Sequence, residues 1–230
     1  MSAGAGARLR VDMHSHTRLS FDCLSRPEAV LRTIRERGID RLVVTDHNAI
    51  DNALRMRDLD PERVLVGEEV KTREGFDVIG IFLSELIPKR TPARETCERI
   101  LAQGGVVYIP HPFDTARSGA GEAFLDSLSD MIDVVEVHNS RCLTRTVNAR
   151  AERWAAAHGK LRGAGSDAHT LAELGAGFVT VPPFEPTRES FLAALAAGDA
   201  SGSRRSSPAY RLASTYAKLH KRLPVVGGRP

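Results

Sequence analysis

Short apolar segments alternate along the chain with longer stretches in which apolar residues recur at helical spacing. The apolar segments predict strands at residues 9–14, 41–45, 63–70, 76–83, 106–109, 134–138, 161–166 and 178–181. The stretches between them predict helices at about residues 26–37, 49–57, 92–103, 146–158 and 189–197. The third and fourth strands are close enough in sequence for a hairpin-like link.

Local signals support this pattern at the first helix. Residues 25–28 (Ser-Arg-Pro-Glu) have the form of a capping box with proline near the first helical position, and Gly38 marks the helix end. Regular alternation of strands and helices predicts an α/β fold with a mostly parallel sheet. Seven or eight strands within residues 1–199 fit one small barrel better than two domains.

The composition is that of a globular protein. Of 230 residues, 42% are hydrophobic and 27% are charged, which argues against disorder, a fibrous repeat or a disulfide scaffold. No apolar run is long enough to span a bilayer, and residues 1–8 lack the apolar core of a signal peptide. The three cysteines (Cys23, Cys97 and Cys142) are widely spaced, which favours a reducing compartment. We therefore expect a cytoplasmic protein.

The distribution of charge changes near the end of the chain. The net charge of 32 − 29 = +3 is too small to indicate a nucleic-acid partner by itself. Residues 200–230 nevertheless contain seven basic residues and no acidic one. We expect residues 1–199 to form the barrel domain and residues 200–230 a basic extension that packs on it or caps it. A solvated tail, an anion-facing lid and a nucleic-acid contact all remain open for this extension.

Polar residues with metal-binding chemistry follow the predicted strands. Six segments carry them: His14 and His16, Asp46 and His47, Glu68 and Glu69, His111, His138 and Asn139, and Asp167 and His169. In a parallel α/β barrel the carboxyl ends of the strands share one face, where sites are built. Imidazole and carboxylate are ligands of zinc, manganese and iron, so this face is a candidate metal site.

The spacing refines the candidate ligands. His14 and His16 stand two residues apart on a strand and point the same way, and Asp167 and His169 have the same spacing. We favour Glu69 over Glu68, because neighbours on a strand face opposite sides. A single histidine at a strand end is more often a capping or core residue, but so many titratable groups gathered without metal would cost several kcal/mol. His158 and His220 fall in predicted helices and read as surface residues.

In their order along the chain, these motifs resemble those of the polymerase and histidinol phosphatase (PHP) family. The matching motifs are His14-Ser15-His16, Ser20-Phe21-Asp22, Thr45-Asp46-His47, Gly67-Glu68-Glu69, His111-Pro112 and Gly165-Ser166-Asp167-Ala168-His169. They cover residues 11 to about 182. The resemblance implies a distorted (β/α)7 TIM-like barrel with two or three divalent ions (Mn, Fe or Zn) at the carboxyl ends of the strands.

The resemblance also implies how the ligands are shared. One ion would take His14, His16, Glu69 and Asp167, a second would share Glu69 and use His111, and a third would take Asp22, His47 and His169. Many members have a histidine where this chain has Asp77, three residues before Gly80, and we expect Asp77 to act as a ligand instead. Many relatives also have an aromatic or aliphatic residue in place of His138. His138 is a candidate extra ligand or general acid, or simply lines the pocket.

The family is chiefly associated with phosphoester hydrolysis. We therefore expect a metal-dependent phosphoesterase that acts on a small phosphorylated metabolite or nucleotide through hydroxide bridging two ions. Arg18, Arg117 and Arg141 belong to the predicted rim loops and are candidate phosphate-binding residues. Asp114 is a candidate for orienting a ligand histidine.

Two other classes of function remain open. The first is an amidohydrolase-like enzyme that hydrolyses C–N or C–O bonds with the same metals, although no lysine stands at a predicted strand end. The second is a nucleic-acid-processing or binding module that uses the basic tail. An aromatic content of 5% disfavours extended base stacking. The expected partner is a small phosphoester; a membrane partner is not expected, and the oligomeric state is open.

Overall fold

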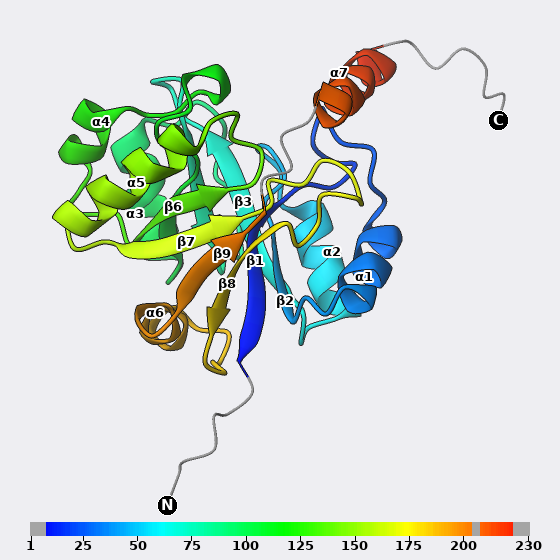
Figure 1. Cartoon of the computed structure of the whole chain (residues 1–230), viewed down its shortest axis with the longest axis horizontal. Coiled ribbons are helices and arrows are strands. Elements are labelled where there is room, and N and C mark those ends of the chain that lie inside the picture. Colours follow the sequence, from blue (N-terminus) through cyan, green and yellow to red (C-terminus); the bar gives the residue numbers. More distant parts are fainter. Residues whose placement is uncertain (1–7, 204–207, 223–230) are drawn as a thin grey trace, which may run out of the picture.

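The computed structural model describes residues 8–203 and 208–222, which form an α/β barrel around one mixed sheet (Figure 1). The nine strands lie in the order β7-β6-β5-β4-β3-β2-β1-β8-β9. They are β1 (Leu9–Ser15), β2 (Arg41–Val44), β3 (Val64–Lys71), β4 (Asp77–Ile81), β5 (Val106–Ile109), β6 (Val134–Asn139), β7 (Leu161–Gly165), β8 (Gly177–Val181) and β9 (Asp199–Gly202). The α/β barrel prediction is confirmed.

Helices cover the outside of the barrel, with α1 and α2 on one side and α3, α4 and α5 on the other (Figure 1). They are α1 (Pro27–Glu36), α2 (Asp51–Leu59), α3 (Ala93–Ala102), α4 (Glu122–Ser127), α5 (Arg145–Ala157), α6 (Arg188–Ala196) and α7 (Pro208–Arg222), with a 3-10 turn η1 (Thr115–Arg117). α1 shows why they form where they do. It begins at Pro27, buries Val30, Leu31 and Ile34, and is followed by Gly38 at φ +63°.

The direction of the strands differs from the mostly parallel sheet expected from sequence. β1, β2 and β3 are parallel neighbours, as are β5, β6 and β7. However, β4 is antiparallel to both β3 and β5, and β8 is antiparallel to β1 and β9. The link between β3 and β4 turns at Gly75 (φ +95°) and is far too short for a crossover helix, which forces the antiparallel hairpin.

The barrel nearly closes where β1 meets β7. The chain just beyond β7 pairs with the end of β1: Asp167 N–H donates to the His14 carbonyl at 2.8 Å, and His16 N–H donates to the Ala168 carbonyl at 3.0 Å. A Cβ atom on Gly165 would lie 2.3 Å from His14 Cβ, so this approach requires glycine. This closure places the first sequence motif, which contains His14, and the last, which contains Asp167, on the same rim of the barrel.

The last described elements lie against that barrel. β9 extends the sheet from β8. α7 lies against the rim, where the Lys221 ammonium donates to the carbonyls of Arg18 and Ser20 and the Ser214 hydroxyl accepts from Arg141 at 2.9 Å. Arg204, Arg205 and Arg229 lie outside the described residues. Within residues 8–203 and 208–222, no helix has both the length and the apolar content needed to cross a membrane.

Candidate metal centre

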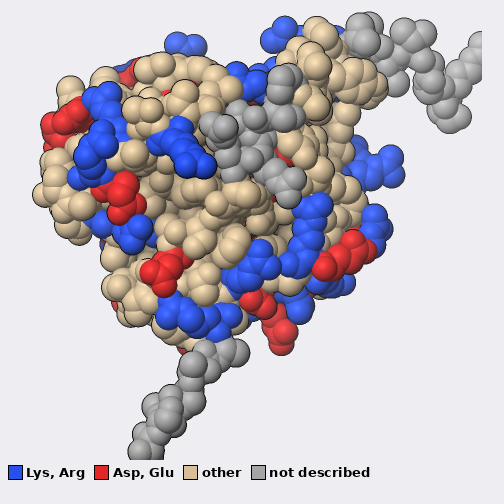
Figure 2. Space-filling model, in the orientation of Figure 1, with Lys and Arg blue, Asp and Glu red and all other residues tan. Residues whose placement is uncertain are grey.

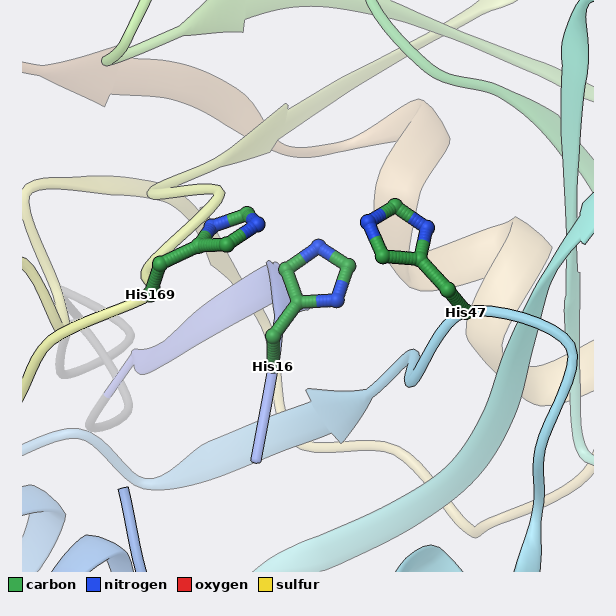
Figure 3. Close-up of side chains that lie close together, drawn as sticks. All are labelled: His16, His47 and His169. Atoms are coloured by element: carbon green, nitrogen blue, oxygen red, sulfur yellow. The ribbon is translucent and has the colours of Figure 1, made fainter. Parts of the chain in front are cut away.

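The candidate ligands gather in one place at the carboxyl ends of the strands. They come from the end of β1 and the loop after it, from the segment after β2, from β3, and from the segments after β5 and β7. They are His14, His16, Asp22, His47, Glu69, His111, Asp167 and His169. Figure 3 shows three of them, His16, His47 and His169, which converge from three separate segments. The structure thus brings together residues up to 155 positions apart, as 169 − 14 shows.

The Glu69 carboxylate lies at the centre of four imidazoles. Its Oε2 atom is 2.9 Å from His47 Nδ1, 3.4 Å from His16 Nε2 and 3.5 Å from His14 Nε2. Its Oε1 atom is 3.3 Å from His111 Nε2. Glu68, by contrast, points to the other side of β3 and accepts from Ile87 N–H at 2.9 Å. The alternation of side chains along β3 therefore selects Glu69.

Two aspartates complete the cluster on either side. Asp167 Oδ1 lies 3.4 Å from His169 Nδ1, 3.5 Å from His16 Nε2 and 3.7 Å from His14 Nε2. Asp22 lies 3.2 Å from His169 Nε2 and 3.6 Å from His47 Nε2. All of these groups except His47 are buried, and His47 is 16% exposed.

The arrangement fits divalent metal ions. In the part of the chain that the structure describes, three groups have ligand atoms within 4.8 Å of one another: His16, His47 and His169; His14, Glu69 and His111; and His14, His16 and Asp167. The Nε2 atoms of His14 and His16 approach to 3.1 Å, so at most one of them carries a hydrogen. Both Glu69 oxygens and Asp22 Oδ1 are buried without a hydrogen bond of acceptable geometry. Closely spaced imidazole nitrogens and unpartnered buried oxygens are what a shared cation would satisfy.

Electrostatic interactions inside the cluster shift the pKa values of neighbouring groups in opposite directions. Burial, together with the nearby His169 and His47, lowers the pKa of His16 to about 3. Burial also disfavours a charged His14, but Asp167, Glu136 and Glu69 overcome it and hold the pKa of His14 well above its usual range. Despite burial, the histidines around Glu69 hold the pKa of that carboxyl well below its usual range. A neutral His16 and an ionised Glu69 are the forms that bind metal.

The backbone is strained at two of these residues. His111 and Asp167 have φ values of 30° and 52°, in the left-handed region that residues other than glycine rarely adopt. Such conformations cost about 1–3 kcal/mol each and are found where surrounding structure and function require them. Asp167 is held there by its N–H bond to the His14 carbonyl and by its side-chain partners. The strain therefore falls on ligand candidates.

Glu136 supports the cluster from behind and was not found from the sequence. Its Oε1 atom lies 3.1 Å from His14 Nδ1, while its Oε2 atom accepts from His111 N–H at 2.7 Å and from Asn139 Nδ2 at 2.9 Å. A carboxylate only accepts, so His14 keeps a hydrogen on Nδ1, and when a metal ion displaces the proton from Nε2 the lone pair of that atom faces the cluster. The available signal was an acidic residue inside the apolar strand Val134-Val135-Glu136-Val137.

Two of the three candidate phosphate-binding arginines line the cavity. Arg117 contacts the Asp167 carboxylate and pairs with Asp114 at 2.9 Å, so Asp114 orients an arginine rather than a histidine. Arg141 pairs with Glu173 at 3.0 Å and lies 2.7 Å from His169 Nδ1. Both line a cavity of about 500 Å³ that also contains Glu69, His111 and Asp167.

Arg18 is not among the residues that line this cavity. It lies in the loop after β1, where its carbonyl accepts from the Lys221 ammonium of α7. α7 therefore packs against this loop. The structure therefore does not bring Arg18 to the cluster with Arg117 and Arg141.

Asp77 reaches the cavity but is bound to a lysine. Its Oδ2 atom lies 2.6 Å from Lys71 Nζ, and both residues line the cavity. Burial and the nearby Glu69 raise the pKa of Asp77 to about 6. Asp77 belongs to none of the three ligand groups found among the described residues. Lys71 is the last residue of β3, so the expectation that no lysine stands at a strand end is wrong: pairing with β4 extends β3 by one residue.

His138 does not face the cluster. It lines a separate cavity of about 560 Å³ together with Thr144, Arg145 and Asn148. The pairing of β6 with β7 is irregular between Glu136 and His138, and such a bulge breaks the usual rule that residues two apart point the same way. Glu136 therefore points at His14 while His138 points elsewhere, which sequence spacing could not show.

Comparison of the sequence with known proteins supports the family resemblance of the ligand motifs. A family described as PHP-associated matches residues 145–200. The uncharacterized protein MJ1587 of Methanocaldococcus jannaschii is 31% identical over 144 residues, which cover 57% of this chain and 84% of that protein. The chain belongs to the PHP family. The uncharacterized protein MJ0417 of the same organism is also 31% identical, over 175 residues that cover 74% of this chain and 70% of that protein.

A solved structure shows the same fold. It is a two-domain protein of Bacteroides vulgatus that contains a predicted PHP-like metal-dependent phosphoesterase. The two structures superpose with a TM-score of 0.70 at 17% identity, over 86% of this PHP protein. This chain spans only 65% of that protein. At this identity the likeness establishes the PHP-like barrel and nothing about the reaction.

Proposed function

We propose that this PHP protein is a metal-dependent phosphoesterase that hydrolyses a small phosphorylated metabolite or nucleotide. The observation that carries the proposal is the buried cluster around Glu69, whose oxygens face four imidazoles and lack hydrogen bonds of acceptable geometry. Two arginines, Arg117 and Arg141, line the same cavity. Metal ligands beside arginine are the combination that phosphoryl chemistry requires.

In this proposal the ligands divide among three positions, of which the first two share Glu69. His14, His16, Glu69 and Asp167 would hold one ion, and Glu69 and His111 would hold a second. Asp22, His47 and His169 would hold a third. Divalent ions (Mn, Fe or Zn) supply a Lewis acid for a phosphoryl oxygen and lower the pKa of a bound water.

The chain's own residues prepare this site. Glu136 fixes the tautomer of His14, and Asn139 donates to both Glu136 and Asp167 at 2.9 and 3.2 Å. Arg117 balances the charge of Asp167, and its pKa is raised above the usual range although burial acts in the opposite direction. Arg117 and Arg141 present N–H groups along the cavity wall, where they would bind the phosphoryl oxygens that the ions leave free.

The size and charge of the site favour a small substrate. A cavity of about 500 Å³ lies within the usual range for small-molecule sites. On the face that Figure 2 shows, Lys and Arg side chains are interspersed with Asp and Glu rather than gathered into one basic surface. Extended nucleic-acid binding usually needs such a basic surface.

Phosphate release tests the proposal. Chelator-stripped protein refilled with manganese is assayed against phosphomonoesters and nucleotides, with a bis-ester such as bis-p-nitrophenyl phosphate and a panel of amides beside them. We expect metal-dependent release that is lost in His14→Ala and Asp167→Ala. The control variant is His158→Ala, because His158 stacks on Trp154 far from the cluster. Hydrolysis of amides alone would replace the proposal by the amidohydrolase alternative, and no turnover with metal bound would favour a binding module.

A further inference from the structure

We propose that α7 carries a second anion-binding subsite, in which Arg211 and Lys218 hold an anionic group of the substrate other than the scissile phosphate. This inference rests on the proposed function and names the substrate class: a phosphoester that bears a second phosphate or carboxylate. The subsite lies in residues 208–222, beyond the motifs that identify the family.

α7 forms one wall of the cavity that contains the cluster. Arg211, Ser214, Thr215 and Lys218 line this cavity together with Glu69. Ser214 and Thr215 each stand three or four positions from both Arg211 and Lys218, so the four residues share one face of the helix. The wall is therefore continuous along about two turns of α7.

Contacts with the rim hold this face of α7 in position. Ser214 accepts from Arg141 at 2.9 Å, and Lys221 donates to the carbonyls of Arg18 and Ser20. Ala217 is 2% exposed although Tyr216 and Leu219 of the same helix are exposed, which shows that one face of the helix packs against the barrel. In Figure 1, α7 stands apart from the helices that flank the sheet, at the end of the barrel where the ligand-bearing loops lie.

The cations on α7 are less engaged than the others in the cavity. Lys71 is paired with Asp77 at 2.6 Å, Arg117 with Asp167 and Asp114, and Arg141 with Glu173. Arg211 makes no ion pair within residues 8–203 and 208–222.

Among the described residues, the one ion-pair partner of Lys218 is Asp22, at a long distance of 3.7 Å, and Lys218 lies 5.1 Å from the centroid of the Phe21 ring. Asp22 is also a ligand candidate, and an ion bound there would weaken this contact. Arg211 and Lys218 are therefore the positive charges of the cavity that are least engaged by protein groups.

The position of these charges defines what they would bind. Arg117 and Arg141 lie beside Asp167 and His169, where the scissile phosphate would bind. Arg211 and Lys218 line the same cavity from α7, and Lys218 lies beside the Phe21 ring. From there they would contact the rest of the substrate. Arg211 is exposed and the Lys218 side chain is 42% exposed, so both stay hydrated beside a neutral leaving group and would contribute nothing to its binding. A second anionic group would satisfy both.

Binding of non-hydrolysable probes tests the subsite without relying on turnover. Manganese-loaded protein is titrated calorimetrically with alkane-α,ω-bisphosphonates that have ethane, butane and hexane chains. Each is compared with the ω-hydroxyalkylphosphonate of the same length. We expect at least one bisphosphonate to bind about tenfold more tightly than its partner, as a second charge-assisted contact allows. Arg211→Gln and Lys218→Gln should reduce that ratio to near unity, and Lys218→Arg should preserve it.

Arg222→Gln is the matched control, because it removes one positive charge from the same helix outside the cavity lining. It should leave the ratio unchanged. Equal binding of both probes at every length, a ratio that survives in Arg211→Gln and Lys218→Gln, or equal loss in Arg222→Gln would overturn the subsite. Phosphate release from p-nitrophenyl phosphate is measured separately. A bisphosphonate preference without any hydrolysis would refute the proposed function and leave the subsite intact.

Discussion

Exchanging Glu136 for glutamine tests how the structure prepares His14 for metal. In the wild-type protein, Oε2 accepts from His111 N–H and Asn139 Nδ2, while Oε1 faces His14 Nδ1 at 3.1 Å. The glutamine oxygen can take the Oε2 position and keep both donors. Its NH2 group then faces His14 Nδ1 and makes that nitrogen an acceptor. The hydrogen of His14 moves to Nε2, which is the atom that faces Glu69 and Asp167.

The expected loss of metal affinity follows from this change of the His14 tautomer. Losing the partner that orients a ligand histidine typically costs 10–100-fold in metal affinity, which is about 1.4–2.7 kcal/mol. The two hydrogen bonds at Oε2 persist but become neutral, so we expect the free energy of unfolding of the metal-free protein to fall by only about 1–2 kcal/mol. The effect on metal affinity should therefore exceed what loss of folding explains.

Metal affinity is measured by competition with a chromophoric chelator, and stability by urea unfolding of the same samples. Glu68→Gln is the matched control, because Glu68 is equally buried but faces Ile87 on the other side of β3. We expect Glu68→Gln to bind metal as the wild type does. Unchanged metal affinity in Glu136→Gln, or an equal loss in both variants, would refute the role assigned to Glu136.

Three further predictions concern stability and reactivity. Burial raises the pKa of Glu68 from 4.5 to about 7, so the wild-type protein loses stability as pH rises through this interval. Glu68→Gln should gain up to about 3 kcal/mol over the wild type above about pH 7, and a urea-unfolding difference that does not change with pH would contradict this. Gly165→Ala should destabilise the protein by about 1–3 kcal/mol or prevent folding, since its Cβ would meet His14 Cβ; wild-type melting would disprove the close packing. Burial raises the pKa of Cys97 to about 12, so iodoacetamide should label it slowly in the native protein and fast in urea, and equal rates would show that the thiol is accessible.

The sequence predicted the parts of the site that depend on local periodicity. Strand β5 has the predicted bounds, and the polar residues after β1, β2, β5 and β7 meet at one rim as expected. The choice of Glu69 over Glu68 also followed from alternation along one strand. These features depend on short-range geometry, which a sequence pattern contains directly.

The remaining features depend on contacts between distant segments. The bulge that separates the directions of Glu136 and His138 arises from pairing with β7. Lys71 joins the site because β4 folds back on β3. Arg211 and Lys218 reach the cavity because α7 lies against the loop after β1. Each is set by tertiary packing, which hydrophobic periodicity cannot specify.

The most direct test of the central claim measures bound metal and turnover on the same samples. Chelator-stripped protein is loaded with increasing manganese, the bound metal is counted by mass spectrometry, and phosphate release is followed at each loading. We predict that release rises with bound metal and levels off at two or three ions per chain, and that Glu69→Gln binds less metal and releases less phosphate in proportion. Phosphate release from metal-free protein, or full metal loading of Glu69→Gln, would contradict the metal centre described above.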